Sequence, residues 1–265
     1  MSYAHQLSKT SLVALLAAAC PIVAQQPSDT DVVEYTRQVA TAHRAERLRL
    51  ADELESTLDR SSTDDQRATI EQRISDLRFE PTQQAPLPVD WPPTSPVGEI
   101  VLKRYPKYRM ATTSMSEGRE TMPFWRLFGH IKSNDIAMTA PVQMDRASQP
   151  GDGERMAFLY REESLGPVGK QGDVEVIDVM PTLAISIGVR GYRSEKRVDE
   201  LAAELRAWLD AHRDEFEGSG AVRVMGYNGP SVRGSRRFYE VEIPVRRVVH
   251  EERAAPASAV PTDSK

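Results

Sequence analysis

The densest cluster of prolines in the sequence lies between residues 81 and 98, and it limits how the chain can fold on either side. Proline fixes φ and has no backbone N–H, so a segment this rich in proline cannot form a helix and favours an extended, semi-rigid conformation. We therefore interpret residues 81–97 as a linker and as the clearest domain boundary in the chain. The prolines are Pro81, Pro86, Pro88, Pro92, Pro93 and Pro96.

Residues 25–80, before the linker, have a helix-forming composition. From residue 31 to residue 80 there is no glycine or proline, and 20 of the 50 residues are charged, as in a solvated helix. Apolar residues recur at helical spacing around Leu54 and again around Ile74, and residues 61–65 between them supply turn and N-cap residues. We predict a charged helical hairpin, which is either a coiled coil that pairs with another chain or a solvated spacer.

Residues 1–24 have the pattern of a secretory signal peptide. His5 and Lys9 precede an apolar run over residues 12–19, and small residues up to Ala24 suit a cleavage site before Gln25. An alternative is a lipoprotein signal that leaves Cys20 lipidated. Under both interpretations we expect an exported protein, periplasmic or extracellular, whose mature chain has no transmembrane span and no disulfide.

Beyond the linker, the sequence contains an internal similarity between two stretches. Tyr105-Pro106 has its counterpart in Met180-Pro181, and each pair follows a short apolar run and precedes a second one. Each copy is a strand, a proline corner, a strand and then a helix, and the second helix is expected over residues 194–212. Two further strands are expected over 221–227 and 238–243. This pattern predicts an α+β domain in which two helices cover a curved, mostly antiparallel sheet.

Composition and motifs narrow the classes of function. A net charge of −5 gives no electrostatic reason to bind nucleic acid. The sequence has no phosphate-binding loop, hydrolase elbow or metalloprotease motif, and its scattered histidines lack carboxylates at motif spacing, so we predict a protein that is not an enzyme. Residues 249–265, rich in alanine, proline and serine, are expected to be disordered.

Residues 121–144 combine a short helix with a strand. Four large apolar residues at i, i+3, i+4 and i+7 place one apolar face on a helix over residues 121–131, and residues 136–144 follow as a strand in which Pro141 favours an edge or a bulge. The four residues are Phe124, Leu127, Phe128 and Ile131.

From residue 98 to residue 248 the sequence resembles the SOUL, or heme-binding protein, family. The central likeness is the segment Ile-Ala-Met-Thr-Ala-Pro-Val at 136–142 after an apolar helix. Weaker similarities occur in the same order at residues 99–108, 111–113, 156–160 and 237–242. The resemblance implies a distorted eight-stranded antiparallel β-barrel of two pseudo-symmetric strand–helix halves, with two packed helices, preceded here by the helical hairpin.

The resemblance also implies a ligand, heme or a related tetrapyrrole, held in an apolar cleft against the 121–131 helix. Side chains at positions that match Phe124 and Phe128 contact the ligand in the family. Gly129 stands where a basic residue is expected to meet a propionate, and His130 stands where the family commonly has tyrosine. His130 is therefore a candidate iron ligand that the motif does not supply.

Other residues of the same helix suit a flat, apolar, anionic ligand. Trp125 lies on a different face from the apolar stripe, where its ring can stack on a macrocycle, and Arg126 or Lys132 can pair with a carboxylate. For Phe124 and Phe128, packing in the core is the competing explanation.

Two functions follow from these patterns. The first is an exported tetrapyrrole-binding protein that holds heme or a porphyrin reversibly, without covalent attachment. The second is a non-catalytic structural or protein-interaction module of the cell envelope, in which the helical hairpin contacts a partner or a second copy of the chain.

Overall fold

The computed structural model of the chain describes residues 29–58, 63–115, 120–147 and 153–248. The predicted signal peptide, the proposed cleavage and lipidation sites and the predicted tail lie outside these residues. The described residues contain four α-helices: α1 (Asp29–Leu58), α2 (Asp64–Leu77), α3 (Thr121–Ser133) and α4 (Glu195–Ala211). A short 3-10 helix covers Gly234–Arg236.

In the part of the chain that the structure describes, ten strands form one antiparallel sheet. They are β1 (Ile100–Tyr105), β2 (Tyr108–Met115), β3 (Val142–Asp145), β4 (Glu154–Leu159), β5 (Gly169–Gln171), β6 (Val174–Val179), β7 (Thr182–Arg190), β8 (Phe216–Gly218), β9 (Arg223–Gly226) and β10 (Phe238–Arg247). The strand order is β1-β7-β10-β9-β3-β4-β2-β6-β5, and β8 also pairs with β10. The α+β class is therefore confirmed.

The prediction of a closed eight-stranded barrel was wrong, because the sheet has ten strands and its order begins at β1 and ends at β5 without a pairing between them. The order does run symmetrically outward from the central β9–β3 pair, through β10 and β7 on one side and β4 and β2 on the other. The two proline corners also lie opposite each other, since Tyr105 pairs with Thr182 and Tyr108 with Val179. Two repeated halves would produce a strand order of this kind. The organisation of the sheet into two pseudo-symmetric halves nevertheless stays a prediction.

Both sheet helices pack on one face of the sheet. α3 contacts β2, β4 and β6, and α4 contacts β7, β8 and β10. Alternate strand residues point to this side, as in β10, where Val241, Ile243 and Val245 join Leu127 of α3 and Leu205 of α4 in one core. α3 thus occupies the expected place, and the predicted second helix is found at nearly the expected bounds. The strand expected over 136–144 begins only at Val142.

The opposite face of the sheet, here called the second face, is covered by residues 79–97. Phe79 and Trp91 of this segment belong to a second core with Tyr105, Tyr108 and Phe238 of the sheet. The proline-rich segment was expected to be a linker between domains. It contains no helix, as expected, but it turns at Val89 and Asp90 and lies against the sheet, where its aromatic side chains are buried. The division of the chain into domains stays a prediction.

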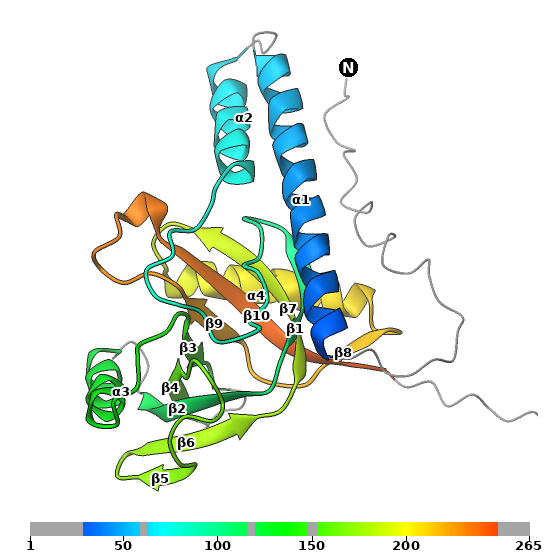
Figure 1. The fold of residues 1–265 in the computed structure, drawn as a ribbon. Coiled ribbons are helices and arrows are strands. Elements are labelled where there is room, and N and C mark those ends of the chain that lie inside the picture. Colours follow the sequence, from blue (N-terminus) through cyan, green and yellow to red (C-terminus); the bar gives the residue numbers. More distant parts are fainter. Residues whose placement is uncertain (1–28, 59–62, 116–119, 148–152, 249–265) are drawn as a thin grey trace, which may run out of the picture.

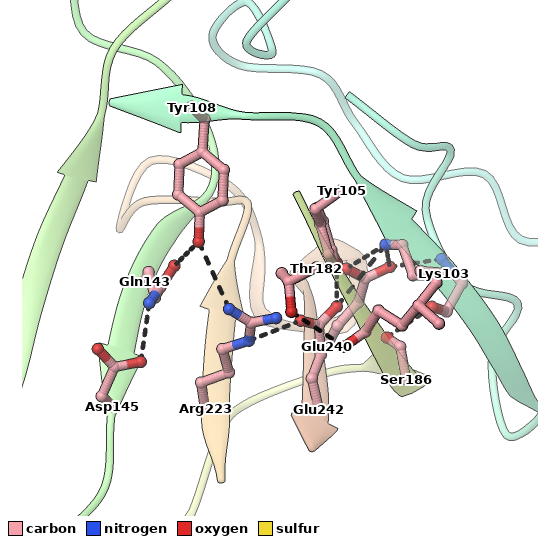
Figure 2. A network of polar contacts seen from close by, with 12 residues as sticks. Lys103, Tyr105, Tyr108, Gln143, Asp145, Thr182, Ser186, Arg223, Glu240 and Glu242 are labelled. Carbon is pink, nitrogen blue, oxygen red and sulfur yellow. Dashed lines mark hydrogen bonds and ion pairs between the residues drawn. The ribbon is translucent and has the colours of Figure 1, made fainter. Parts of the chain in front are cut away.

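Buried charges lie on the second face, beneath and beside this segment (Figure 2). Lys103 Nζ donates to both carboxylate oxygens of Glu240 at 2.9 Å, and the Tyr105 hydroxyl donates to Glu242. Arg223 Nε lies 3.2 Å from Glu242 Oε2. These five side chains are at most 5% exposed, so each charge is balanced by a neighbouring one rather than by water.

The helices α1 and α2 pack side by side, and α2 projects beyond the sheet together with the adjoining part of α1 (Figure 1). Arg190 at the end of β7 donates to Ser75 of α2 at 2.6 Å. The contact between the two helices contains few apolar residues, chiefly Ala51, Ile74 and Leu77. Arg78, just after α2, adds hydrogen bonds to Asp52 and Glu55 of α1. The described residues contain no helix that is both long and apolar enough to cross a bilayer.

Candidate functional site

The helix α3 is fixed on the sheet by the apolar face that its spacing predicted. Pro123, Leu127 and Ile131 are buried, and Phe124 and Phe128 are half-buried against the same core. The helix ends at Asn134, whose side chain donates to the carbonyl oxygen of His130 at 2.8 Å. The remaining faces of α3 are therefore held toward solvent on a rigid support.

Four side chains form an apolar surface on α3, here called the α3 patch: Met122, Phe124, Trp125 and Phe128. Met122 is 69% exposed and Trp125 is 58% exposed. The Trp125 ring stands edge-on to the rings of Phe124 and Phe128, with both centroid distances 5.6 Å. The half-buried phenylalanines thus support an exposed tryptophan. We did not predict Met122, although it precedes Trp125 by three residues and so lies on the same side of the helix.

The two predicted basic residues lie in different surroundings. Arg126 Nη1 donates to Thr113 Oγ1 of β2 at 3.0 Å, and its Nε lies 3.5 Å from Asp173 Oδ2. Lys132 is exposed and follows Phe128 by four residues, which places it beside the α3 patch. Lys132 is therefore the better placed of the two to meet an anionic group at the α3 patch.

His130 is turned toward the sheet. Its Nε2 lies 2.8 Å from the hydroxyl of Tyr160, which is 1% exposed. Partial burial lowers the pKa of the imidazole, and burial raises the pKa of the Tyr160 hydroxyl, so both groups favour the neutral form. The structure thus brings Phe124, Trp125 and Phe128 together and directs His130 to a different partner.

A cavity in the described part of the molecule lies away from α3. It measures about 650 Å³ and lies between the α1–α2 pair and one end of β7, where Arg78, Arg190 and Arg236 line it together with Glu55 and Glu71. Within the described ranges, no three histidine, cysteine, aspartate or glutamate side chains gather in a way that could hold a metal ion.

The fold and the patch define an α+β domain with one antiparallel sheet and an exposed aromatic surface on one of its two helices. Residues 96–244 match the family model described as SOUL heme-binding protein. The chain belongs to this family. A search of curated proteins found no match.

Solved structures similar to the chain share little sequence with it. The C-terminal domain of EcmrR is 13% identical, with a TM-score of 0.42, and the alignment covers 56% of this chain and 98% of that domain. A hydrolase from Listeria innocua is 9% identical, with a TM-score of 0.41 and coverage of 57% and 94%. SAV2435 bound to tetraphenylphosphonium is 13% identical, with a TM-score of 0.37 and coverage of 56% and 94%.

Proposed function

We propose that the chain binds heme or a related tetrapyrrole reversibly on the α3 patch, without covalent attachment. The observation that carries the proposal is the exposed ring of Trp125, supported from below by Phe124 and Phe128. A macrocycle that covers these rings removes a large apolar area from water, and apolar burial is the main source of affinity for a ligand of this kind. Membership of the SOUL heme-binding family supports the same ligand class.

The residues around the α3 patch fit the ring and its carboxylates. A Cβ at Gly129 would have no atom within 4 Å, so the surface beside Trp125 is open to a flat ligand. Lys132 can reach a carboxylate at the edge of the α3 patch. Arg126 can reach a carboxylate only if it gives up its hydrogen bond to Thr113. Its pairing with Asp173 is solvent-exposed and weak, so that pairing would not prevent the movement.

Iron coordination fits this structure less well than ring binding does. Bound heme would supply a redox-active iron, but His130 Nε2 is engaged by Tyr160 and the imidazole would have to leave that contact to act as a ligand. The affinity therefore rests on the macrocycle, and we infer a binding role without catalysis.

We also propose that the protein acts outside the cytoplasm, because residues 1–24 have the pattern of a signal peptide. The alternative function, an interaction module of the cell envelope, draws support from the pair α1–α2, because α2 and the adjoining part of α1 project beyond the sheet (Figure 1). The exposed ring of Trp125 and the match to the SOUL family favour the binding role over the interaction role.

Titration with hemin and with metal-free protoporphyrin tests the proposal. We expect both ligands to bind in the micromolar range, and Trp125→Ala to weaken both by about 2 kcal/mol, or roughly 30-fold in Kd. Tyr192→Ala is the matched control, because Tyr192 is an aromatic residue that is 71% exposed but lies outside α3. The proposed tetrapyrrole-binding function is wrong if neither ligand binds the wild type in this range. The proposed site is wrong if Trp125→Ala and Tyr192→Ala change the Kd values by the same factor.

A further inference from the structure

Two neighbouring segments at one end of the sheet concentrate positive charge. Residues 190–197 and 229–237 contain seven arginine or lysine residues and one acidic residue, whereas the whole chain has a net charge of −5. Gly191 N donates to the Arg237 carbonyl oxygen at 2.9 Å, so the two segments lie side by side where β7 ends and β10 begins, away from α3 (Figure 1). The net charge of the chain therefore does not describe this surface, which attracts anions locally.

Three arginines of the second segment keep their charge available. The four basic residues of the first segment are each paired with a carboxylate, as Arg193 is with Glu120. In contrast, Arg233, Arg236 and Arg237 have no carboxylate partner among the described residues, and the first two are exposed. A guanidinium without such a partner can bind a phosphate, sulfate or carboxylate through two parallel hydrogen bonds.

The loop that carries these arginines is held in place by its own hydrogen bonds. The Arg237 guanidinium donates to the carbonyl oxygens of Val232 and Pro230, both at 2.9 Å. Arg190 Nε donates to the Ser235 carbonyl oxygen at 2.7 Å, which ties the loop to the end of β7. The loop is thus ordered before any ligand arrives, so less conformational entropy is lost on binding.

Tyr192 presents an aromatic ring beside the arginines. The Arg237 guanidinium lies over this ring, 5.0 Å from its centroid. Gly234 packs against it closely, since a Cβ at that position would lie 2.1 Å from a ring carbon. Tyr192 is nevertheless 71% exposed, so these contacts support the ring and leave a large part of it open to solvent. A supported, open ring is a surface on which a flat group can stack.

The ring and the arginines together restrict the class of ligand. A ring that is 71% exposed lies on an open surface, where a small molecule would bury little area and a polymer with repeated contacts binds better. The Arg237 guanidinium already lies where a cation would bind the ring, so the open part suits a flat aromatic group. Acidic peptides and sulfated polysaccharides supply negative charge without such a group at each repeat.

We propose that this surface binds single-stranded nucleic acid, with a base stacked on Tyr192 and backbone phosphates bound to Arg233 and Arg236. A single strand supplies a flat base and a negative charge at every nucleotide, and its bases are free to stack on an aromatic side chain. The surface is separate from the α3 patch, and the proposal does not depend on tetrapyrrole binding.

A fluorescein-labelled oligothymidylate of about 12 nucleotides tests the surface in the full-length chain, with anisotropy measured between about 50 and about 200 mM salt. We expect Tyr192→Ala to raise the Kd about tenfold without changing the salt dependence, because stacking releases no counterions. The double variant Arg233→Ala and Arg236→Ala should instead reduce the slope of log K against log salt by about 1.4, since each phosphate contact on a single strand contributes about 0.7.

Two controls match these variants. Tyr192→Phe keeps the ring and should bind as the wild type does. The double variant Arg206→Ala and Arg213→Ala removes the same charge, because both arginines are exposed, lie outside the two segments and have no carboxylate partner among the described residues. This variant should leave the slope unchanged.

Absence of binding to the wild type at about 50 mM salt would overturn the proposal. It is also overturned if Tyr192→Ala binds the oligonucleotide as the wild type does and dextran sulfate, which has no aromatic ring, competes as well as unlabelled oligonucleotide. The surface would then be a site for sulfated polysaccharide. Trp125→Ala should bind the oligonucleotide like the wild type, so the outcome is separate from that of the tetrapyrrole titration.

Discussion

The contact between His130 and Tyr160 determines what the imidazole of α3 can do. The Tyr160 hydroxyl is buried, and His130 Nε2 at 2.8 Å is the partner that satisfies it. Coordination of iron through Nε2 would leave this hydroxyl unpaired, which costs about 1–3 kcal/mol. The structure therefore assigns His130 first to the packing of α3 on the sheet.

We expect His130→Ala to change the Kd values of hemin and metal-free protoporphyrin by a similar factor, because ring contacts at the α3 patch are retained. The same variant should lower the free energy of unfolding by about 1–3 kcal/mol, since it leaves the Tyr160 hydroxyl buried and unpaired. Tyr160→Phe is the matched control, and it should cost less, because the partly exposed imidazole can bind water instead. A loss of hemin binding alone, with a shifted Soret band, would restore the axial role.

Glu242 leads us to expect a particular sign for the pH dependence of the stability of the chain. Burial raises the pKa of this carboxyl, against the opposing effects of Lys103 and Arg223. A raised pKa in the folded state means that the group contributes stability below its unfolded pKa of about 4.3, and that this contribution is lost as the pH rises through the folded pKa.

Glu242→Gln removes the ionisation while keeping an acceptor for Tyr105. The free energy of unfolding of the wild type, relative to that of the variant, should therefore fall as the pH rises from about 4.3 through the folded pKa, as measured by urea unfolding at several pH values. Glu217→Gln is the control of opposite sign, because Arg246 lowers the pKa of this exposed carboxyl. A wild-type advantage that grows with pH at Glu242 would contradict the assignment.

Phe124, Trp125 and Phe128 of the α3 patch could be predicted from the sequence, because helical spacing alone gives α3 an apolar face and places Trp125 beside it. Met122 was not predicted. The partners of the polar residues could not be predicted either. Arg126 bonds to Thr113 and His130 to Tyr160, residues that are distant in sequence and come near only through strand pairing.

Among the elements, the segment 79–97 differs most from its prediction. Its proline content correctly excludes helix, but composition does not say whether an extended segment lies in solvent or on a sheet. Two residues of the segment indicate that it packs on the sheet. Trp91 and Phe79 are large apolar side chains, which a solvated linker rarely carries. Their burial against Tyr105 and Phe238 makes the segment part of the folded unit.

A series of N-terminal truncations measures this contribution. Removal of residues 1–78 keeps Phe79 and Trp91 and should leave cooperative unfolding close to that of the full chain. Removal of residues 1–85 loses the contact of Phe79 with Phe238, and removal of residues 1–97 also loses Trp91, whose burial is worth about 3–5 kcal/mol. Urea unfolding should therefore show stability falling in that order. Equal midpoints for all three truncations would mean that residues 79–97 are a linker after all.

At the scale of the whole molecule, the sheet has two differently covered faces. Helices α3 and α4 cover one face, and residues 79–97 cover much of the other (Figure 1). The α+β class and the helix positions follow from periodicity in the sequence. The strand order, and the fact that β1 and β5 at the two ends of the sheet do not pair, depend on contacts between strands distant in sequence. The alternation of apolar residues along a single strand does not specify which strand it pairs with.

The proposed location of the molecule outside the cytoplasm depends on the pattern of residues 1–24. If they are a signal peptide, mass spectrometry of the mature chain from the producing cell should find Gln25 at the N-terminus, because Ala24 ends the small-residue cleavage site. A lipoprotein signal would instead leave an acylated Cys20, which adds the mass of the lipid and moves the protein to the membrane fraction. Replacing Cys20 with serine distinguishes the two, since it abolishes lipidation and leaves ordinary cleavage intact. Recovery of the chain with Met1 in place would reject export, and with it a tetrapyrrole-binding role outside the cytoplasm.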